Sequence, residues 1–585
     1  MTAMRQLFWV VLTALLIGAC EGGEQPTGAP ALNIDSSGIT IFTARDIITM
    51  DSDRPHAEAI AVSGGRIVAV GSLAEIADEL GERSHQVDSQ FENQVIVPGL
   101  IDQHVHPLLA ALSMNMEIIA IEDWVLPTGT AKAATDHNDY IARLVAAEAE
   151  MTGAAETLFT WGFHHYFHGR LTRQDLDAIS ATRPIVVWHR SAHEFILNTP
   201  AMVTYGITPA FYAEFSESAK AQSNYEEGHF WEQGWFAVLY KLMPVLTEPS
   251  KLRSGLEFVE DYLHAAGVTL IAEPGGLVSK ELQDAQNAVF GDVDTPFRSY
   301  FIVDGKTMAT TQLNDLIAAT EAPLSWGSGK VEFLPMQVKL FADGAIFSQA
   351  MQMIDGYTDG HEGEWMIDLD IFAEAFNTYW DAGYQLHIHQ NGDAGLEMVL
   401  DLLEAAQRRR PREDHRTTMV HFGFSTAEQV DRIAELGAIV SANPYYLTAL
   451  ADNYSANGLG PERADEMVRL GDVVRAGVPL SLHSDMSMAP SQPLFLMWSA
   501  VNRTTVSGRV AGPDQRISVE EALKAVTIGA AYSLRLEDTV GSLQPGKLAN
   551  LTILDESPYE VDPDLIKDIG IWGTMLEGIV YPISK

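Results

Sequence analysis

Residues 95–106 read VIVPGLIDQHVH, an apolar strand that leads into two histidines. Because residues i and i+2 of a strand face the same side, His104 and His106 can converge on one ion. An H-x-H pair alone is weak evidence, since most such pairs are surface or core residues. The meaning of this pair therefore depends on what the rest of the chain places beside it.

Strand-like and helix-like segments alternate downstream of this pair. The helical segments end at Gly267, Gly383 and Gly437, and each glycine leads into a strand. Such repeated βα units predict a parallel sheet, open or closed. We expect strands at residues 184–188, 268–272, 337–341, 385–389, 418–422, 438–442 and 479–482. We expect helices at residues 251–266, 371–382, 395–408, 426–436 and 519–533, the last opening with a capping box. The irregular stretch 108–184 resembles an insertion.

The two chain ends carry a different pattern. Residues 39–48 and 59–70 are rich in β-branched side chains, and Gly64-Gly65 predicts a hairpin turn in the second of them. A comparable β signal returns only at residues 550–554 and 578–582. This pattern indicates one small β domain that is built from both ends of the chain.

The N-terminus is typical of an export signal. Arg5 precedes an apolar run of 13 residues, 7–19, which is too short to span a bilayer as a helix. The following motif, Ile-Gly-Ala-Cys at residues 17–20, resembles the lipobox of bacterial lipoproteins, in which the cysteine is lipidated and becomes the first mature residue. Residues 1–19 are then a signal peptide, and residues 20–35 a flexible tether. A plain secretory signal with a chance Cys20 is the alternative.

Composition excludes several classes of protein. The charge count of 37 − 79 = −42 repels phosphate backbones and argues against nucleic-acid binding. A single cysteine permits no intrachain disulfide and no cysteine-based zinc site, so a metal must use histidine and carboxylate ligands. With 46% hydrophobic residues the chain is globular, and 585 residues allow two to four units or one large barrel with additions.

Four further polar residues lie in or after apolar segments that are predicted strands. Each has an ordinary interpretation as a buried histidine, a lysine with a solvated tip or a helix-capping aspartate. In a (β/α)8 barrel, however, groups at the strand ends form the active site at the C-terminal face. These residues are Lys339, His389, His421 and Asp485.

The ordered set of H-x-H, Lys, His, His and Asp resembles the amidohydrolase superfamily, from Thr40 to the C-terminus. The flanking sequences agree: IVPGLIDQHVH, VKLFADGAIFSQA, HQNGD, VHFGFS, ELGAIVSANP and VPLSLHSD. The DGA motif after the lysine and RSAHEFILN are similar to the amidohydro-3 branch, which includes N-substituted formamide deformylase-like proteins. The resemblance implies an α/β fold with a (β/α)8 TIM-like barrel over residues 98–533. It also implies a small β-sandwich formed by residues 36–97 and 534–585.

The resemblance also implies a binuclear metal centre. His104 and His106 would bind one divalent ion with Asp485, and His389 and His421 would bind the second. Lys339, carboxylated by carbon dioxide, would bridge the two ions. Imidazole and carboxylate ligands favour zinc, with iron, manganese or nickel as alternatives.

Several residues depart from the pattern of the family. His483 stands where relatives usually have glycine, and Asn550 replaces a frequent aspartate. A cluster of histidines stands where relatives often have an acidic residue, and packing under a loop is an equally good account of it. The residues of this cluster are His164, His165 and His168. We expect substrate contacts from His193, which lies with His189 in WHRSAHEFILN, and as weaker candidates from His164, His165 and His483.

The leading functional hypothesis is a metal-dependent hydrolase that cleaves an amide or formamide-type C–N bond in a small molecule. A metal-bridging hydroxide would attack the carbonyl, and Asp485 would accept its proton and pass it to the leaving nitrogen. An esterase, lactonase or phosphotriesterase on the same site is the alternative. A lipid-anchored solute-binding protein is a third reading. We expect an exported protein on the outer membrane, facing the periplasm, and leave a homo-oligomer open.

Overall fold

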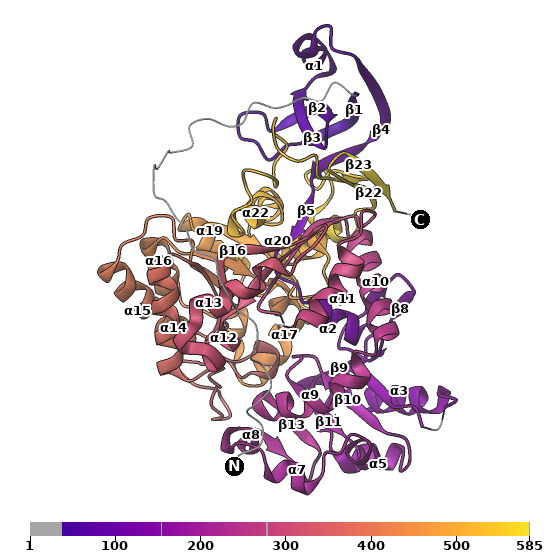
Figure 1. Ribbon diagram of the computed structural model, residues 1–585, viewed down its shortest axis with the longest axis vertical. Helices are drawn as coiled ribbons and strands as arrows, with labels where there is room; N and C mark the ends of the chain where they lie inside the picture. Colours follow the sequence, from indigo (N-terminus) through magenta and orange to yellow (C-terminus); the bar gives the residue numbers. More distant parts are fainter. Residues whose placement is uncertain (1–37, 154, 277–278, 584–585) are drawn as a thin grey trace, which may run out of the picture. The chain divides into compact units, whose positions relative to one another are not determined.

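The computed structural model describes residues 38–153, 155–276 and 279–583 (Figure 1). The signal peptide, the tether and Cys20 lie outside these residues, and their assignments stay predictions. Among the helices that are described, none is both long enough and apolar enough to cross a membrane.

Eight parallel strands within the described ranges form a barrel sheet, and they follow one another in chain order. They are β5 (Leu100–Asp102), β14 (Val268–Pro274), β15 (Arg298–Asp304), β16 (Val331–Phe341), β17 (Gln385–Gln390), β18 (Thr418–His421), β19 (Ile439–Ala442) and β20 (Leu480–Leu482). The first and last strands meet just beyond their ends, where Val105 and Met486 form a parallel bridge. Asp485 N also donates to His104 O at 2.9 Å. The barrel therefore closes at the rim that carries the H-x-H pair, and the predicted barrel fold is confirmed.

Helices pack around this sheet because each carries one apolar face. They include α10 (Pro249–Ala265), α14 (Leu369–Ala382), α15 (Asp393–Arg409) and α16 (Ala427–Leu436). The predicted glycine ends are confirmed, since Gly267, Gly383 and Gly437 have φ of 73°, 89° and 70°. The helix expected at residues 519–533 is instead two helices, α21 (Val519–Ala525) and α22 (Ile528–Ser533). The break follows from Thr527, whose Oγ1 donates to Leu523 O and whose backbone is not helical.

An insertion between β5 and β14 holds a sheet of its own. In chain order its strands are β6 (Glu117–Ile118), β9 (Leu158–Phe163), β10 (Ile185–His189), β11 (Glu194–Leu197), β12 (Ser223–Asn224) and β13 (His229–Trp231). The strand expected at residues 184–188 is β10, but it pairs with β9 and β11 and not with a barrel strand. The insertion thus runs well past residue 184, and Figure 1 shows its strands together with α9 (Glu232–Leu246).

Strands from both chain ends form a separate sheet domain, as predicted. The strands are β1 (Ile39–Ile48), β2 (His56–Ser63), β3 (Arg66–Gly71), β4 (His85–Pro98), β21 (Leu551–Leu554), β22 (Ile571–Leu576) and β23 (Ile579–Pro582). β4 joins the two ends, because it pairs parallel with β1 and antiparallel with β21. The hydrogen-bonded ladder is continuous from β23 to β3, so the two ends share one sheet with its own core around Phe42, Phe91 and Met575.

Candidate active site

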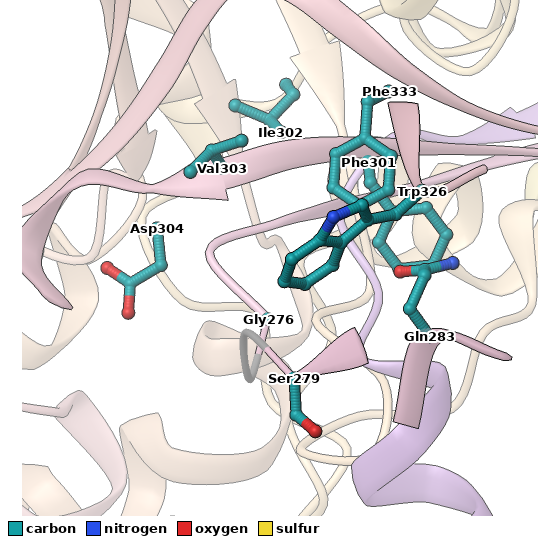
Figure 2. A pocket seen from close by; sticks show the side chains of 9 residues that line it. All are labelled: Gly276, Ser279, Gln283, Phe301, Ile302, Val303, Asp304, Trp326 and Phe333. Carbon is teal, nitrogen blue, oxygen red and sulfur yellow. The ribbon is translucent and has the colours of Figure 1, made fainter. Parts of the chain in front are cut away.

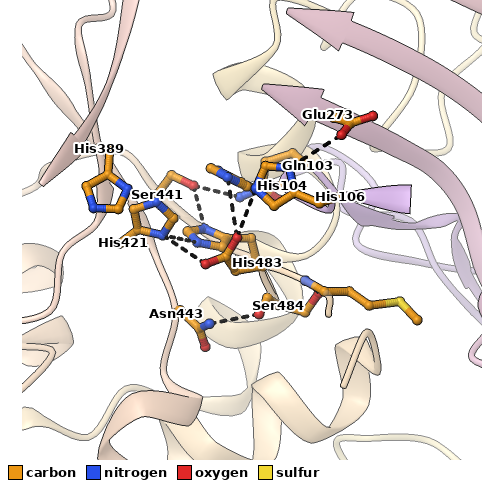
Figure 3. A network of polar contacts seen from close by, with 12 residues as sticks. Gln103, His104, His106, Glu273, His389, His421, Ser441, Asn443, His483 and Ser484 are labelled. Atoms are coloured by element: carbon orange, nitrogen blue, oxygen red, sulfur yellow. Dashed lines mark hydrogen bonds and ion pairs between the residues drawn. The ribbon is translucent and has the colours of Figure 1, made fainter. Parts of the chain in front are cut away.

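The predicted ligands gather at the C-terminal rim of the barrel. His104 and His106 follow β5, Lys339 lies on β16, and Asp485 follows β20 by three residues. His389 lies on β17 and His421 ends β18. In Figure 3 the rings of His389 and His421 lie on one side of the group, and those of His104 and His106 on the other. The structure therefore brings together all six residues that the sequence pattern singled out, which we call the rim set.

Asp485 stands at the centre of the rim set. Its Oδ1 lies 3.6 Å from His104 Nε2 and 3.3 Å from His106 Nε2, and its Oδ2 lies 3.5 Å from His421 Nδ1. Ligand atoms that share one zinc ion at about 2.0–2.1 Å lie about 3.3 Å apart. The ligand atoms of His104, His106 and Asp485 all lie within 4.8 Å of one another, which fits one ion.

The second predicted pair is also close. The rings of His389 and His421 lie 4.4 Å apart, centroid to centroid. His389 Nε2 lies 3.0 Å from Asn391 Nδ2, which must move aside before this nitrogen can bind an ion. His389 is therefore placed beside the centre, with its Nε2 in contact with the amide of Asn391.

Lys339 is completely buried below the rim, and its Nζ has no hydrogen-bond partner among the described residues. Burial lowers the pKa of Lys339 to about 7, although the charges of Asp485 and Asp304 act in the opposite direction. A neutral amine is the form that reacts with carbon dioxide, so this orphaned nitrogen fits a carboxylated lysine. Gly275 makes room for the side chain, because a Cβ there would lie 2.7 Å from Lys339 Cγ.

Burial keeps most of the imidazoles neutral. It lowers the pKa of His104, His389 and His421 well below the usual value, and neutral imidazole is the form that binds metal. His106 differs: burial lowers its pKa, but bonds to Asp485 and Glu273 outweigh this and raise the pKa to about 9. An ion at this position must therefore displace a proton from His106 when it binds.

His483 is fully buried beside His104 and His421, and its expected contact with substrate stays a prediction. Its Nδ1 lies 2.8 Å from Ser441 Oγ, and its Nε2 lies 3.3 Å from His421 Nδ1. Its ring stacks on that of His104 at 4.8 Å. His104, His421 and His483 form a second group whose ligand atoms lie within 4.8 Å of one another, so His483 is a potential ligand that the sequence interpretation missed.

Two further residues were missed. Glu273 is the next-to-last residue of β14, and its Oε1 lies 3.4 Å from His106 Nδ1. It follows an apolar strand, the same signal that identified Asp485, so the sequence offered a way to find it. Tyr446 OH lies 3.2 Å from His421 Nδ1 and 3.4 Å from Asp485 Oδ2, and no sequence pattern pointed to it.

Backbone strain coincides with these ligands. His421 has φ of 77° and Asp485 has φ of 58°, values that residues with a Cβ rarely adopt. Such conformations persist only where the surrounding structure enforces them, and they concentrate at functional sites.

A cavity of about 50 Å³ opens over the rim set. It joins a larger chamber of about 130 Å³, because His106, His193, Phe341 and Met488 line both. The chamber wall is mainly apolar and includes Leu108, Leu109, Trp235, Phe236 and Met366. His193 is thus placed where the sequence expected it, whereas His164 and His165 line neither space and their contact with substrate stays a prediction. The separate pocket in Figure 2, lined by Trp326 and Phe333, holds only about 20 Å³, room for about one water.

The model of the amidohydrolase family (Amidohydro_3) matches residues 91–581. The chain belongs to this family. The predicted enzyme class, a hydrolase of carbon–nitrogen bonds, is confirmed. The clustered histidine and carboxylate groups support the use of a divalent metal.

Comparisons with individual proteins agree with this assignment. The protein LONG AFTER FAR-RED 3 of Arabidopsis thaliana is 26% identical over 95% of this chain and 91% of its own length. The N-substituted formamide deformylase of Arthrobacter pascens is 24% identical over 92% and 96%. The crystal structure of an uncharacterized metal-dependent hydrolase from Pyrococcus horikoshii has a TM-score of 0.68 at 19% identity, covering 90% of this chain and 99% of that one. The last comparison shows a shared fold.

Proposed function

We propose that this amidohydrolase cleaves an amide or formamide-type C–N bond in a small molecule that carries an apolar substituent. The observation that supports this most is the convergence of Asp485 with His104, His106 and His421 near Lys339, a buried lysine whose Nζ has no hydrogen-bond partner among the described residues. The similarity to a formamide deformylase points to the same bond class.

The rim set would hold two divalent ions, with zinc favoured. His104, His106 and Asp485 would hold one ion, and His389 and His421 the other, with carboxylated Lys339 between them. When bound, such an ion lowers the pKa of water and polarises a carbonyl oxygen. His483 is close enough to replace a ligand or to orient the ring of His421.

Asp485 would move the proton during hydrolysis. Its Oδ1 lies 3.3 Å from His106 Nε2, and the residue lines the cavity over the rim set. A carboxylate in this position can take a proton from water and deliver it to the leaving nitrogen, which an amide requires because its anion is a poor leaving group. Tyr446, at 3.4 Å, would hold the other oxygen in place.

The apolar chamber would bind the substituent. It shares His106 and His193 with the cavity over the rim set and is also lined by Trp235 and Phe236, so a group attached to the scissile bond would extend toward these side chains. Burial of apolar surface contributes about 25 cal/mol per Å², which favours amides with aromatic or branched substituents over formamide itself.

The test is a hydrolysis panel with protein of known metal content. N-alkyl and N-aryl formamides, acetamides and matched esters would be compared at a fixed zinc load. We expect metal-dependent amide cleavage with a lower KM for larger N-substituents, and loss of turnover in His104→Asn. Turnover of esters alone would assign the site to the esterase class, and full activity without metal would refute the proposal.

We also propose that the protein is exported and anchored through Cys20, on the evidence of the 17–20 motif. Cys20→Ser should leave the protein unlipidated and release it from the membrane fraction. A wild-type mature N-terminus downstream of Cys20 would contradict this proposal.

A further inference from the structure

A second histidine cluster lies in the insertion, outside the catalytic cavity. His164 precedes α4 (His165–His168), His165 begins it, and His189 ends β10. One ring nitrogen from each lies within 4.8 Å of the others. The ring centroids are 5.3 Å apart for His164 and His189, 5.1 Å for His165 and His189, and 5.6 Å for His164 and His165. Three imidazoles that share one tetrahedral ion at about 2.0–2.1 Å place their centroids about 5 Å apart.

Two of these rings leave a nitrogen without a partner. His164 Nε2 and His189 Nε2 are buried and have no hydrogen bond within the described part of the chain. Buried polar atoms are nearly always satisfied, so two such nitrogens in one cluster point to a ligand between them. Burial keeps both rings neutral, since it lowers the pKa of His189 to about 3 and that of His164 well below its usual value.

We infer that His164, His165 and His189 form a second site for a divalent transition-metal ion, with zinc as the best match to three neutral imidazoles. This site is distinct from the rim set, and it does not depend on the reaction proposed above. Imidazole is the ligand that zinc, nickel and copper share, and a site of three histidines leaves one position for water.

The carboxylate of Glu194 lies beside the cluster, near His189 Nδ1. His189 Nδ1 lies 2.9 Å from Ser191 Oγ and 3.5 Å from Glu194 Oε1. Glu194 is held in turn by Ser348 Oγ at 2.8 Å and His229 Nε2 at 2.9 Å. Histidines that bind metal commonly donate their second ring hydrogen to such a carboxylate.

The hydrogen bonds around the cluster indicate which proton an ion would displace. Ser191 N donates to His189 Nδ1 at 3.0 Å, and Tyr166 N donates to His164 Nδ1 at 3.3 Å. These contacts place the ring hydrogens on the Nε2 atoms. An ion at His189 Nε2 would displace that hydrogen. Nδ1 can take it up once Ser191 N gives up its bond to this nitrogen, and Ser191 Oγ and Glu194 would then accept it, so the ring stays neutral.

The cluster is accessible through His165. This partly buried residue lines a cavity of about 200 Å³ together with His229, Glu194 and Glu364. The carboxylates of the two glutamates would attract a cation. Ser348 lines the same cavity and is adjacent to Phe347, which lines the catalytic cavity. An ion at the cluster would therefore stabilise the position of the insertion relative to the wall of the active site, through the contact of Glu194 with Ser348.

The test counts zinc in the full-length holoprotein. His165→Gln should hold one zinc per chain less than the wild type, and the double variant His164→Asn/His165→Gln should behave alike. His361→Gln is the matched control, because His361 lines the same cavity but both its ring nitrogens are bonded, Nδ1 to Asp359 and Nε2 to Gln349 O. It should keep the wild-type zinc content.

Cobalt reconstitution provides a second readout. Part of the visible absorption of the cobalt protein should disappear in His165→Gln and persist in His104→Asn, where the rim set is disrupted instead. The inference is overturned if His165→Gln and the double variant hold as much zinc as the wild type, or if His104→Asn removes all of it. Both results can be obtained even if no amide is hydrolysed, so they are independent of the proposed reaction.

Discussion

The two histidine groups of this protein differ in how the chain assembles them. The six residues of the rim set lie on or just after five barrel strands, between His104 and Asp485, and the barrel brings them together. The insertion cluster takes its three rings from residues 164–189. Only the rim set adds a buried lysine, Lys339, and only it lies beside a mainly apolar chamber.

The difference suits the rim set to catalysis and the insertion cluster to structural support. A hydrolytic site needs a group that moves a proton and a space for substrate, and the rim set has both. The insertion cluster has a carboxylate, Glu194, but His229 and Ser348 already bond to it. We therefore expect changes in the rim set to abolish turnover, and changes in the insertion cluster to alter zinc content while much of the turnover remains.

The largest effect is expected for Lys339→Ala. Without the lysine the two halves of the rim set lose their bridge, so activity should fall below detection and the zinc of the rim set should be lost. The zinc of the insertion cluster should remain. Short carboxylic acids should restore part of the turnover by filling the vacated space. Wild-type zinc content and turnover in a folded Lys339→Ala protein would contradict the bridging role.

Asp485→Asn should have the next largest effect. The amide cannot accept a proton, and general acid–base assistance typically contributes 10²–10⁴-fold, so kcat should fall by about that factor. Much of the rim zinc should remain, since the histidines still hold it. The measurement is kcat at matched zinc content. A kcat near the wild-type value would show that Asp485 only closes the barrel rim through its backbone bond to His104.

A comparison of the two supporting carboxylates should give a smaller effect. Glu273→Gln removes the charge beside His106, and loss of such a partner typically weakens metal binding or activity by about 10–100-fold. Glu194→Gln should instead weaken zinc binding at the insertion cluster. Competition with a chelator measures both affinities. If the two variants weaken the same zinc ion, the separation of the two sites is wrong.

The pH dependence of reconstitution should show the smallest effect. Because burial lowers the pKa of Lys339 to about 7, most of its amine is free at pH 8 and little of it at pH 6. Reconstitution of metal-free protein with zinc, at the same concentration of dissolved carbon dioxide at both pH values, should therefore restore activity roughly tenfold faster at pH 8 than at pH 6. Equal rates, with and without bicarbonate, would argue against carboxylation.

The sequence predicted the barrel and the rim set well because both follow local rules. An apolar strand that ends in a polar residue marks the rim, and a glycine marks the end of the preceding helix. The rules failed where pairing is decided at long range. Residues 184–188 have the composition of a barrel strand, yet their partners lie in the insertion. Strand β15 was not predicted.

The sequence also did not predict the side-chain contacts within the site. The contacts of His483 with His104 and His421 were not predicted, because position along the chain does not show in which direction a side chain at a strand end points. Tyr446 reaches the site from α17 (Tyr445–Ala456), which no motif identifies. Glu273 follows an apolar segment, as Asp485 does, so the same pattern also indicates it.

Anomalous diffraction at the zinc edge, on crystals of the active holoprotein, tests the account most directly. We predict a peak between His104, His106 and Asp485, accompanied by a second beside His389 and His421, and a separate peak among His164, His165 and His189. Active protein with no anomalous density between His104, His106 and Asp485 would contradict the central claim that the rim set is a metal-dependent hydrolytic site.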